Sequence, residues 1–298
     1  MRTTKKKLIC VFVFLGLLGG MKVSILEAKE KANQGDAEAH YNLGLRYYIG
    51  EGVEKDDTEA FKWWKKAAEQ GHAKAQLLLG DMCLLGMGVK QDYTEAFKWW
   101  EKAAEQGRAE AQCNLGLMYL EGDGVKQDYT EAFKWSKKAA EQGHAEAQGN
   151  LGWMYFKGDG VKQDYKEAFK WSKKAAEQGV AEAQCNLGSM YFKGDGVKQD
   201  YTEAFKWAKK SAEQGHANAQ YFLCLMYKKG LGVEKDDTEA VKWYKKIAEQ
   251  GHADVQYSLG LMYEKGLGVE KDDTEAVKWY KKAAEQGHAE ALQYFERL

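Results

Sequence analysis

Residues 109–143 read AEAQCNLGLMYLEGDGVKQDYTEAFKWSKKAAEQG, and this stretch decides the fold. In its first half Ala111, Leu115 and Met118 follow the i, i+4, i+7 spacing that places apolar side chains on one face of a helix. Gly122 comes next, where a helix can end on a left-handed residue that glycine adopts without steric cost. The first half therefore predicts one amphipathic helix that ends at a glycine loop.

The second half of the stretch predicts a second helix. Asp128 has the place of an N-cap and Glu131 follows three residues later, which is the spacing of a capping box. The apolar face continues through Trp135, and Gly143 ends the segment. A single pair of helices cannot bury both apolar faces, so this hairpin needs neighbours of the same kind.

The hairpin is written seven times with one period. Each copy has 36 residues, with glycine at positions 15, 17 and 36 of every copy and at position 9 of six copies. A fixed period of this length is the signature of a repeat architecture. The copies are residues 36–71, 72–107, 108–143, 144–179, 180–215, 216–251 and 252–287. Residues 29–35 and 288–298 resemble parts of a copy and are predicted to cap the two ends.

The repeated string A-E-A-Q-x-N-L-G-x-M-Y-x-x-G-x-G-V, followed by A-x-K-W and K-K-A-A-E-Q-G-H, resembles the Sel1-like repeat, a relative of the tetratricopeptide repeat. The resemblance covers residues 36–298 and implies an all-α, right-handed α-solenoid of seven helix-loop-helix repeats with terminal capping helices. Two departures stand out. The family often has proline after the loop valine, and this chain has none, so we expect a looser loop. Cys224 replaces the glycine of position 9 in copy six, which should push its two helices apart.

The first 28 residues predict a signal for export. Four basic residues precede an apolar run at residues 8–21, which is shorter than a membrane span needs and typical of a signal peptide. Its cleavage site is poorly marked, so an uncleaved N-terminal anchor in the inner membrane, held through residues 8–21, is the alternative. We expect the rest of the chain to be exported, either to the periplasm or out of the cell.

Composition excludes several classes of function. The 44% hydrophobic content excludes a disordered linker, and a net charge of −1 argues against nucleic acid as a partner. Five cysteines are too few for a disulfide scaffold, and their repeat positions predict no bridge among Cys83, Cys113, Cys185 and Cys224. The sequence contains no nucleophile, zinc-protease or P-loop motif. We therefore expect no enzyme activity and no cofactor.

Three sets of residues that could form a site have simpler structural explanations. Tryptophan at position 28 of every copy could form a stacking ladder, but its spacing predicts a core residue. Histidine follows the terminal glycine in several copies, and we read it as a turn residue because successive copies lie too far apart for two histidines to share a metal. Acidic pairs such as Asp56 and Asp57 lack a calcium-loop pattern. No metal site is predicted.

The partner-binding surface is predicted on the first helix of each copy, which lines the concave face in tetratricopeptide folds. Positions 6, 10 and 13 share one helical stripe and change identity between copies, and position 14 becomes lysine from copy four onward. The predicted stripe consists of Tyr41, Leu45, Tyr48, Leu77, Asp81, Leu84, Leu117, Leu120, Trp153, Phe156, Phe192, Tyr221, Lys157, Lys193, Lys229 and Lys265. The competing interpretation is that the stripe packs against a neighbouring turn or a second copy of the chain.

The favoured function is an exported bacterial scaffold or adaptor that binds a protein or peptide on its concave face without catalysis. One alternative is a protein that binds or hydrolyses an envelope polymer, peptidoglycan or a β-lactam, as claimed for cysteine-rich members of the family. Another is an accessory protein that assists an envelope enzyme. The partner's identity and the oligomeric state are left open.

Overall fold

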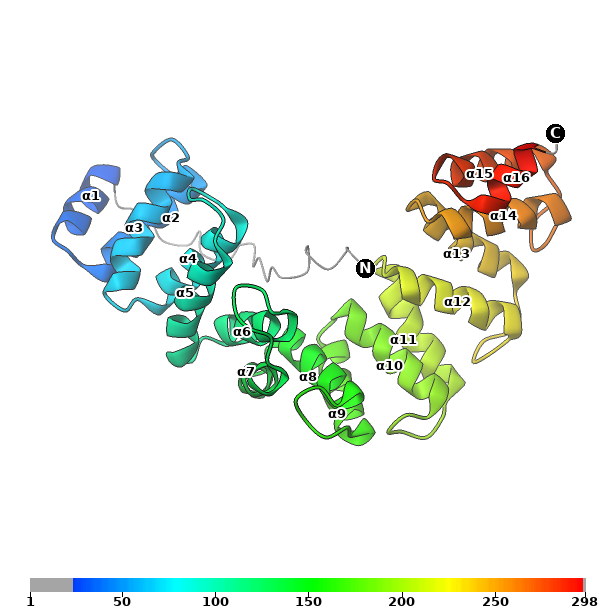
Figure 1. Ribbon diagram of the computed structural model, residues 1–298, viewed down its shortest axis with the longest axis horizontal. Helices are drawn as coiled ribbons and strands as arrows, with labels where there is room; N and C mark the ends of the chain where they lie inside the picture. Colours follow the sequence, from blue (N-terminus) through cyan, green and yellow to red (C-terminus); the bar gives the residue numbers. More distant parts are fainter. Residues whose placement is uncertain (1–23, 297–298) are drawn as a thin grey trace. The chain divides into compact units, whose positions relative to one another are not determined.

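A computed structural model of the chain describes residues 24–296, and within that range the backbone forms α-helices and no strands (Figure 1). The helices are α1 (Ile25–Asn33), α2 (Ala37–Ile49), α3 (Asp57–Glu69), α4 (Ala73–Leu85), α5 (Tyr93–Glu105), α6 (Ala109–Glu121), α7 (Tyr129–Glu141), α8 (Ala145–Lys157), α9 (Tyr165–Glu177), α10 (Ala181–Lys193), α11 (Tyr201–Glu213), α12 (Ala217–Lys229), α13 (Asp237–Glu249), α14 (Ala253–Lys265), α15 (Asp273–Glu285) and α16 (Ala289–Glu296). Apart from residues 24–28, the predicted leader lies outside the described residues.

The helices pair as the repeat predicts, so the all-α solenoid fold is confirmed. Each predicted copy contributes one first helix and one second helix, from α2 and α3 to α14 and α15. The extensive contacts join helices that follow each other in sequence. The chain divides into two compact units, one ending at Gln163 and the other beginning at Asp164. The helices α1 and α16 occupy the ends where caps were predicted.

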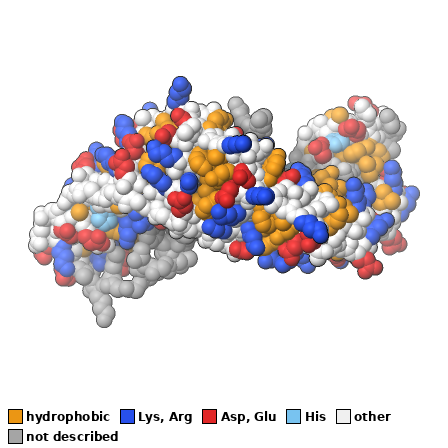
Figure 2. Space-filling view, turned by 90° about the horizontal axis from the view of Figure 1, so that it is seen from below, with side chains coloured by type: hydrophobic (Ala, Val, Ile, Leu, Met, Phe, Trp, Pro, Cys, Tyr) orange, Lys and Arg blue, Asp and Glu red, His pale blue; other side chains and the backbone are white. Residues whose placement is uncertain are grey.

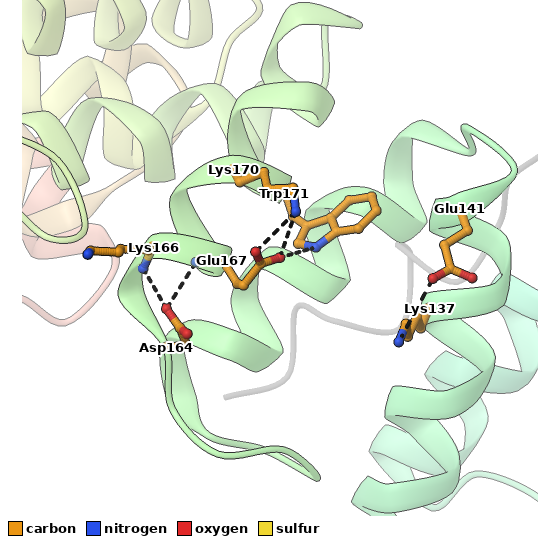
Figure 3. Close-up of polar contacts among 7 residues, drawn as sticks. All are labelled: Lys137, Glu141, Asp164, Lys166, Glu167, Lys170 and Trp171. Atoms are coloured by element: carbon orange, nitrogen blue, oxygen red, sulfur yellow. Dashed lines mark hydrogen bonds and ion pairs between the residues drawn. The ribbon is translucent and has the colours of Figure 1, made fainter.

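The helix boundaries follow from the capping chemistry read in the sequence. Asp128 accepts hydrogen bonds at Oδ1 from the backbone N–H of Thr130, at 2.9 Å, and of Glu131, at 3.1 Å. The same contacts recur at Asp164 before α9 (Figure 3). Gly122 ends α6 with φ of 78°, in the left-handed region. Aspartate capping therefore sets the start of these second helices, and a left-handed glycine sets the end of α6.

The loops between first and second helices are held by hydrogen bonds. In the loop after α6, the backbone N–H of Asp128 donates to the carbonyl of Tyr119 at 2.9 Å, and Gln127 Nε2 donates to the carbonyl of Leu120 at 2.7 Å. These contacts close the loop in a chain that has no proline. The expectation of a looser loop stays a prediction.

Tryptophan at position 28 belongs to the core, as predicted. Six of the seven are buried with 5–9% of their surface exposed, and Trp63 is partly buried. The six buried residues are Trp99, Trp135, Trp171, Trp207, Trp243 and Trp279. The indole N–H of Trp171 donates to Glu167 Oε2 at 3.1 Å, and Lys170 pairs with the same carboxylate (Figure 3). Lys174 lies 4.2 Å from the ring centroid, so charged side chains cover the outer edge of this core residue.

A buried glutamine network crosses from repeat to repeat, and the sequence analysis did not predict it. Gln112 Nε2 donates to the carbonyl of Ala104, in the preceding repeat, at 3.0 Å. Gln142 Nε2 donates to Gln112 Oε1 at 2.7 Å. The same pair of contacts recurs at Gln220, Gln250, Gln256 and Gln286. The network adds a side-chain donor to carbonyls at the end of the previous second helix, such as that of Ala104, which also accepts from the Gly107 N–H at 3.0 Å.

The departure at position 9 of copy six is accommodated inside the core. Cys224 is fully buried, and its thiol donates to the carbonyl of Gln220 at 3.2 Å. Burial raises the pKa of the Cys224 thiol to about 12. The residue therefore behaves as a small apolar group, and the expected widening of this hairpin stays a prediction.

Candidate functional site

An exposed aromatic part of the predicted stripe lies on α8. Trp153 keeps 41% of its surface exposed and stacks on Phe156, with ring centroids 5.8 Å apart and an interplanar angle of 17°. Lys157 places its Nζ 4.8 Å from the centroid of the Trp153 ring. One turn of helix thus presents a flat aromatic surface with a cation beside it, and this combination is suited to binding a peptide.

Three members of the predicted stripe are not accessible, which corrects our expectation that the stripe lies outside the core. Tyr41, Leu45 and Leu84 have only 4–6% of their surface exposed and belong to the core cluster of the first unit. They are buried because each first helix packs against neighbours on more than one side. The covered part of the helix is therefore wider than the repeated core positions indicate. Variation between copies at these positions reflects packing.

Other members of the stripe in the first unit are half-buried. Leu77, Leu117 and Tyr48 pack against the core with part of their surface exposed, and Leu120 is also partly exposed. Only part of each of these apolar side chains is therefore accessible to a partner.

Asp81 departs from the apolar character of the stripe. Its Oδ1 accepts a hydrogen bond from the indole N–H of Trp100 at 3.1 Å. Burial raises the pKa of the Asp81 carboxyl to about 7, although the Trp100 hydrogen bond opposes the rise and the nearby charge of Glu110 adds to it. Asp81 therefore carries a charge that depends on pH near neutrality.

In the second unit the stripe becomes more basic. Tyr221 is 46% exposed, whereas Phe192 packs its ring against Tyr201 and Phe222, with centroids 5.1 Å from each. Lys193, Lys229 and Lys265 are exposed at the last residue of α10, α12 and α14. Each of these helix ends carries the negative end of the helix dipole, which is one reason lysine is favoured there.

Figure 2 shows one face of the molecule, on which hydrophobic side chains form several clusters separated by acidic and basic groups. No field of a single charge covers this face. None of the helices between residues 24 and 296 has the length and apolar character of a membrane span.

The described cysteines Cys83, Cys113, Cys185 and Cys224 are free thiols, which confirms the prediction that they do not form bridges with one another. The histidines that we read as turn residues have a more definite role. His144 is the N-cap of α8, and its Nδ1 accepts from the backbone N–H of Ala147 at 3.3 Å. Cys113 also lies beside His144 and Glu146, a group of three different ligand types that the spacing of like residues does not predict.

An array of helical hairpins whose first helices vary at the surface defines a repeat scaffold, a class that generally mediates protein interactions and is generally not enzymatic. The Sel1 repeat family model matches residues 37–72, 73–107, 109–144, 145–180, 181–216, 217–252 and 253–288. The chain therefore belongs to the Sel1 repeat family, as the repeated string indicated.

Solved structures and a curated relative agree with this assignment. A protective antigen from uropathogenic Escherichia coli strains, described as displaying an SLR fold, is 43% identical with a TM-score of 0.83, over 91% of this chain and 58% of that chain. A Sel1 repeat protein from Oxalobacter formigenes is 37% identical with a TM-score of 0.77, over 92% of this chain and 80% of that chain. The secretory immunoglobulin A-binding protein EsiB of Escherichia coli O6:H1 is 42% identical over 68 residues, which are 21% of this chain and 14% of EsiB. The chain thus spans well under two thirds of the antigen and of EsiB.

Proposed function

We propose that this protein is an exported, non-enzymatic scaffold that holds an extended segment of a partner protein along its first helices. The observation that carries the proposal is the stacked pair of Trp153 and Phe156 with Lys157 beside it. Large aromatic groups that stay exposed on a rigid helix lose little entropy on binding and bury much area, so they are frequent anchors of protein interfaces.

The charge of the surface specifies the chemistry of the partner segment. In the second unit, Lys193, Lys229 and Lys265 are exposed at the same repeat position. Successive lysines at one repeat position complement carboxylates spaced along an extended peptide. We therefore expect a partner with an apolar or aromatic residue for the Trp153 surface of the first unit and with acidic residues for the lysines of the second unit.

The comparisons support a protein partner without identifying it. EsiB is named for binding secretory immunoglobulin A, and the matching stretch covers only a small part of EsiB. The match is consistent with proteins as the partners of such repeats. Our proposal of a protein partner is based on the surface residues of the first helices.

Export is the second part of the proposal. The predicted leader supports it, and the helix α1 refines where cleavage should fall. The Ser24 side chain accepts from the backbone N–H of Glu27 at 3.2 Å and caps α1, so a cut after Ala28 would remove the cap and the first turn. We expect cleavage before Ser24, or retention of the leader as an anchor. N-terminal sequencing of the protein from the periplasmic fraction tests this, and full-length protein found only in the cytoplasm would contradict export.

Site-specific photo-crosslinking in intact cells tests the binding surface. A photoreactive residue at Trp153 should give a discrete protein adduct that mass spectrometry can identify. The matched control is Tyr129, which is equally exposed, at 43%, but begins the second helix α7. Equal adducts at both positions would contradict the assignment of the surface.

The double variant Trp153→Ser, Phe156→Ser should lose capture of the crosslinked partner while keeping its helicity and melting temperature. Charge reversal by Lys193→Glu and Lys229→Glu should weaken capture, whereas Lys137→Glu and Lys173→Glu should not. Lys137 and Lys173 are exposed on second helices and pair with glutamates there, so they match the others in type and exposure. Turnover of muropeptides or a β-lactam by the purified protein would instead favour the enzyme alternative.

A further inference from the structure

The side chains of Cys113 on α6 and of His144 and Glu146 on α8 converge on one point. The thiol sulphur, an imidazole nitrogen and a carboxylate oxygen all lie within 4.8 Å of one another. We propose that these three residues form a binding site for a divalent metal ion, with zinc the ion that the ligands fit best. This proposal revises our expectation that the chain has no metal site.

The repeat explains why these residues meet. Cys113 has position 6 of its copy, and His144 has position 1 of the next copy. In two of the three copies with tyrosine at position 6, the ring stacks on that histidine: the centroids of Tyr41 and His72 are 4.6 Å apart, and those of Tyr257 and His288 are also 4.6 Å apart. Cysteine at position 6 thus replaces a stacking ring with a soft metal ligand beside the same imidazole.

The ligand set and its dimensions fit zinc. Thiolate, imidazole and carboxylate are the three protein ligands that zinc takes, at about 2.3 Å for sulphur and about 2.0–2.2 Å for nitrogen and oxygen. Tetrahedral geometry at those bond lengths places the ligand atoms about 3.5 Å from one another, so atoms at the 4.8 Å limit would have to approach by roughly 1 Å. Glu146 is exposed, and rotation about its side-chain bonds supplies that movement. Asn150 Nδ2 donates to the Cys113 sulphur at 3.9 Å.

Metal binding competes with the cap of α8. In the absence of metal, His144 Nδ1 accepts from the Ala147 N–H. A metal on Nδ1 replaces that contact directly, and a metal on Nε2 requires the proton to move to Nδ1, so the cap bond is lost in either case. Loss of such a cap lowers the affinity roughly fivefold relative to a site without this competition. The Ala147 amide should therefore exchange faster when the metal is bound.

The site joins two first helices of neighbouring repeats. Because repeat stability is a sum of nearest-neighbour terms, a metal that bridges α6 and α8 stabilises that interface. Binding requires the thiol to lose its proton, so the affinity should fall as the pH is lowered.

The chain contains its own control. Cys185 and His216 have the same repeat positions as Cys113 and His144, but Asn218 stands where Glu146 stands. A neutral amide is a much weaker zinc ligand than a carboxylate. We therefore expect one tight site in the wild-type chain and a second one in the variant Asn218→Glu.

Cobalt titration of the reduced, purified full-length chain tests the proposal. Cobalt(II) bound to a thiolate absorbs in the near ultraviolet through charge transfer, so the band reports sulphur ligation directly. The wild-type chain should bind one equivalent with this band, zinc should abolish the band, and Asn218→Glu should bind two equivalents. Cys185→Ser should keep the band and Cys113→Ser should lose it.

The variant Glu146→Gln changes an exposed residue, so it still tests the site if the buried variant Cys113→Ser misfolds. Glu146→Gln should fold normally and bind cobalt at least tenfold more weakly than the wild-type chain. Absence of the band in the wild-type chain would overturn the proposal. So would a band that persists in Cys113→Ser, is lost in Cys185→Ser, or has unchanged affinity in Glu146→Gln.

Discussion

The indole ring of Trp64 lies directly on Gly44, so that a Cβ built on Gly44 would be 2.5 Å from Cδ1 of the ring. The ring cannot move away, because its Nε1 donates to the carbonyl of Tyr41 at 3.0 Å and the side chain is 99% buried. Glycine at position 9 is therefore required wherever position 29 of the same copy is tryptophan.

This contact predicts that Gly44→Ala destabilises the first unit. Overpacking of this kind costs about 1–3 kcal/mol, which exceeds the gain of up to ~1 kcal/mol from replacing a helical glycine with alanine. The matched control is Gly116→Ala, whose Cβ would meet the rotatable hydroxyl of Ser136 at 2.5 Å and backbone atoms no closer than 3.2 Å. Urea denaturation should show a lower free energy of unfolding for Gly44→Ala than for Gly116→Ala.

The double variant Gly44→Ala, Trp64→Ser separates overpacking from a general intolerance of alanine. Serine is the residue found at position 29 in copies three and four, so it removes the ring without introducing a foreign group. Its effect should be less than the sum of the two single effects, because the second change removes the clash caused by the first. Strict additivity would show that the ring is not the reason for the glycine.

Two loop glycines of copy four should differ in their tolerance of substitution. Both Gly158 and Gly160 have positive φ, at 84° and 69°, so alanine strains the backbone at each. A Cβ on Gly158 would lie 3.4 Å from its nearest neighbour, whereas one on Gly160 would overlap the carbonyl oxygen of Tyr129 in the preceding repeat. Gly160→Ala should lower the melting temperature clearly more than Gly158→Ala, and equal effects would contradict the close contact.

Asp81 should make the stability of the chain depend on pH. Its carboxyl pKa is raised to about 7, so between pH 4 and pH 7 the folded chain holds a proton there that the unfolded chain has lost. The stability contribution of Asp81 is therefore present at low pH and falls by about 1.4 kcal/mol per pH unit as the pH rises through this window. Asp81→Asn removes the ionisation, so the variant should be more stable than the wild type at pH 8 and similar at pH 4. Parallel pH profiles for the two proteins would refute this account.

The glutamine network should be costly to break. Gln112→Met replaces a buried amide with a side chain of similar length and leaves the Gln142 amide and the Ala104 carbonyl without this partner. We expect a loss of about 1–3 kcal/mol in the free energy of unfolding. Gln127→Met, which removes an exposed loop contact, is the control and should cost less. A smaller cost at Gln112 than at Gln127 would mean that water replaces the network.

The helix boundaries were predictable from the sequence because they depend on local chemistry. Asp128 caps α7 and Gly122 ends α6 through contacts within a few residues, and the repeat then carries the same boundaries along the chain. The position of Trp135 in the core was predictable for the same reason, since helical periodicity depends only on neighbours in the chain.

Accessibility and side-chain convergence depended on tertiary structure. Tyr41 and Trp153 have variable positions on the same helical face, yet one is buried and the other exposed, because burial depends on what the next repeat places opposite each residue. Cys113 and His144 are 31 residues apart and belong to different copies, so the spacing within one helix could not bring them together. The sequence by itself determined the hairpin, its caps and its period, which are local. The packing of one hairpin on the next decided which side chains remain on the surface and which ones meet, because those contacts join residues of different copies.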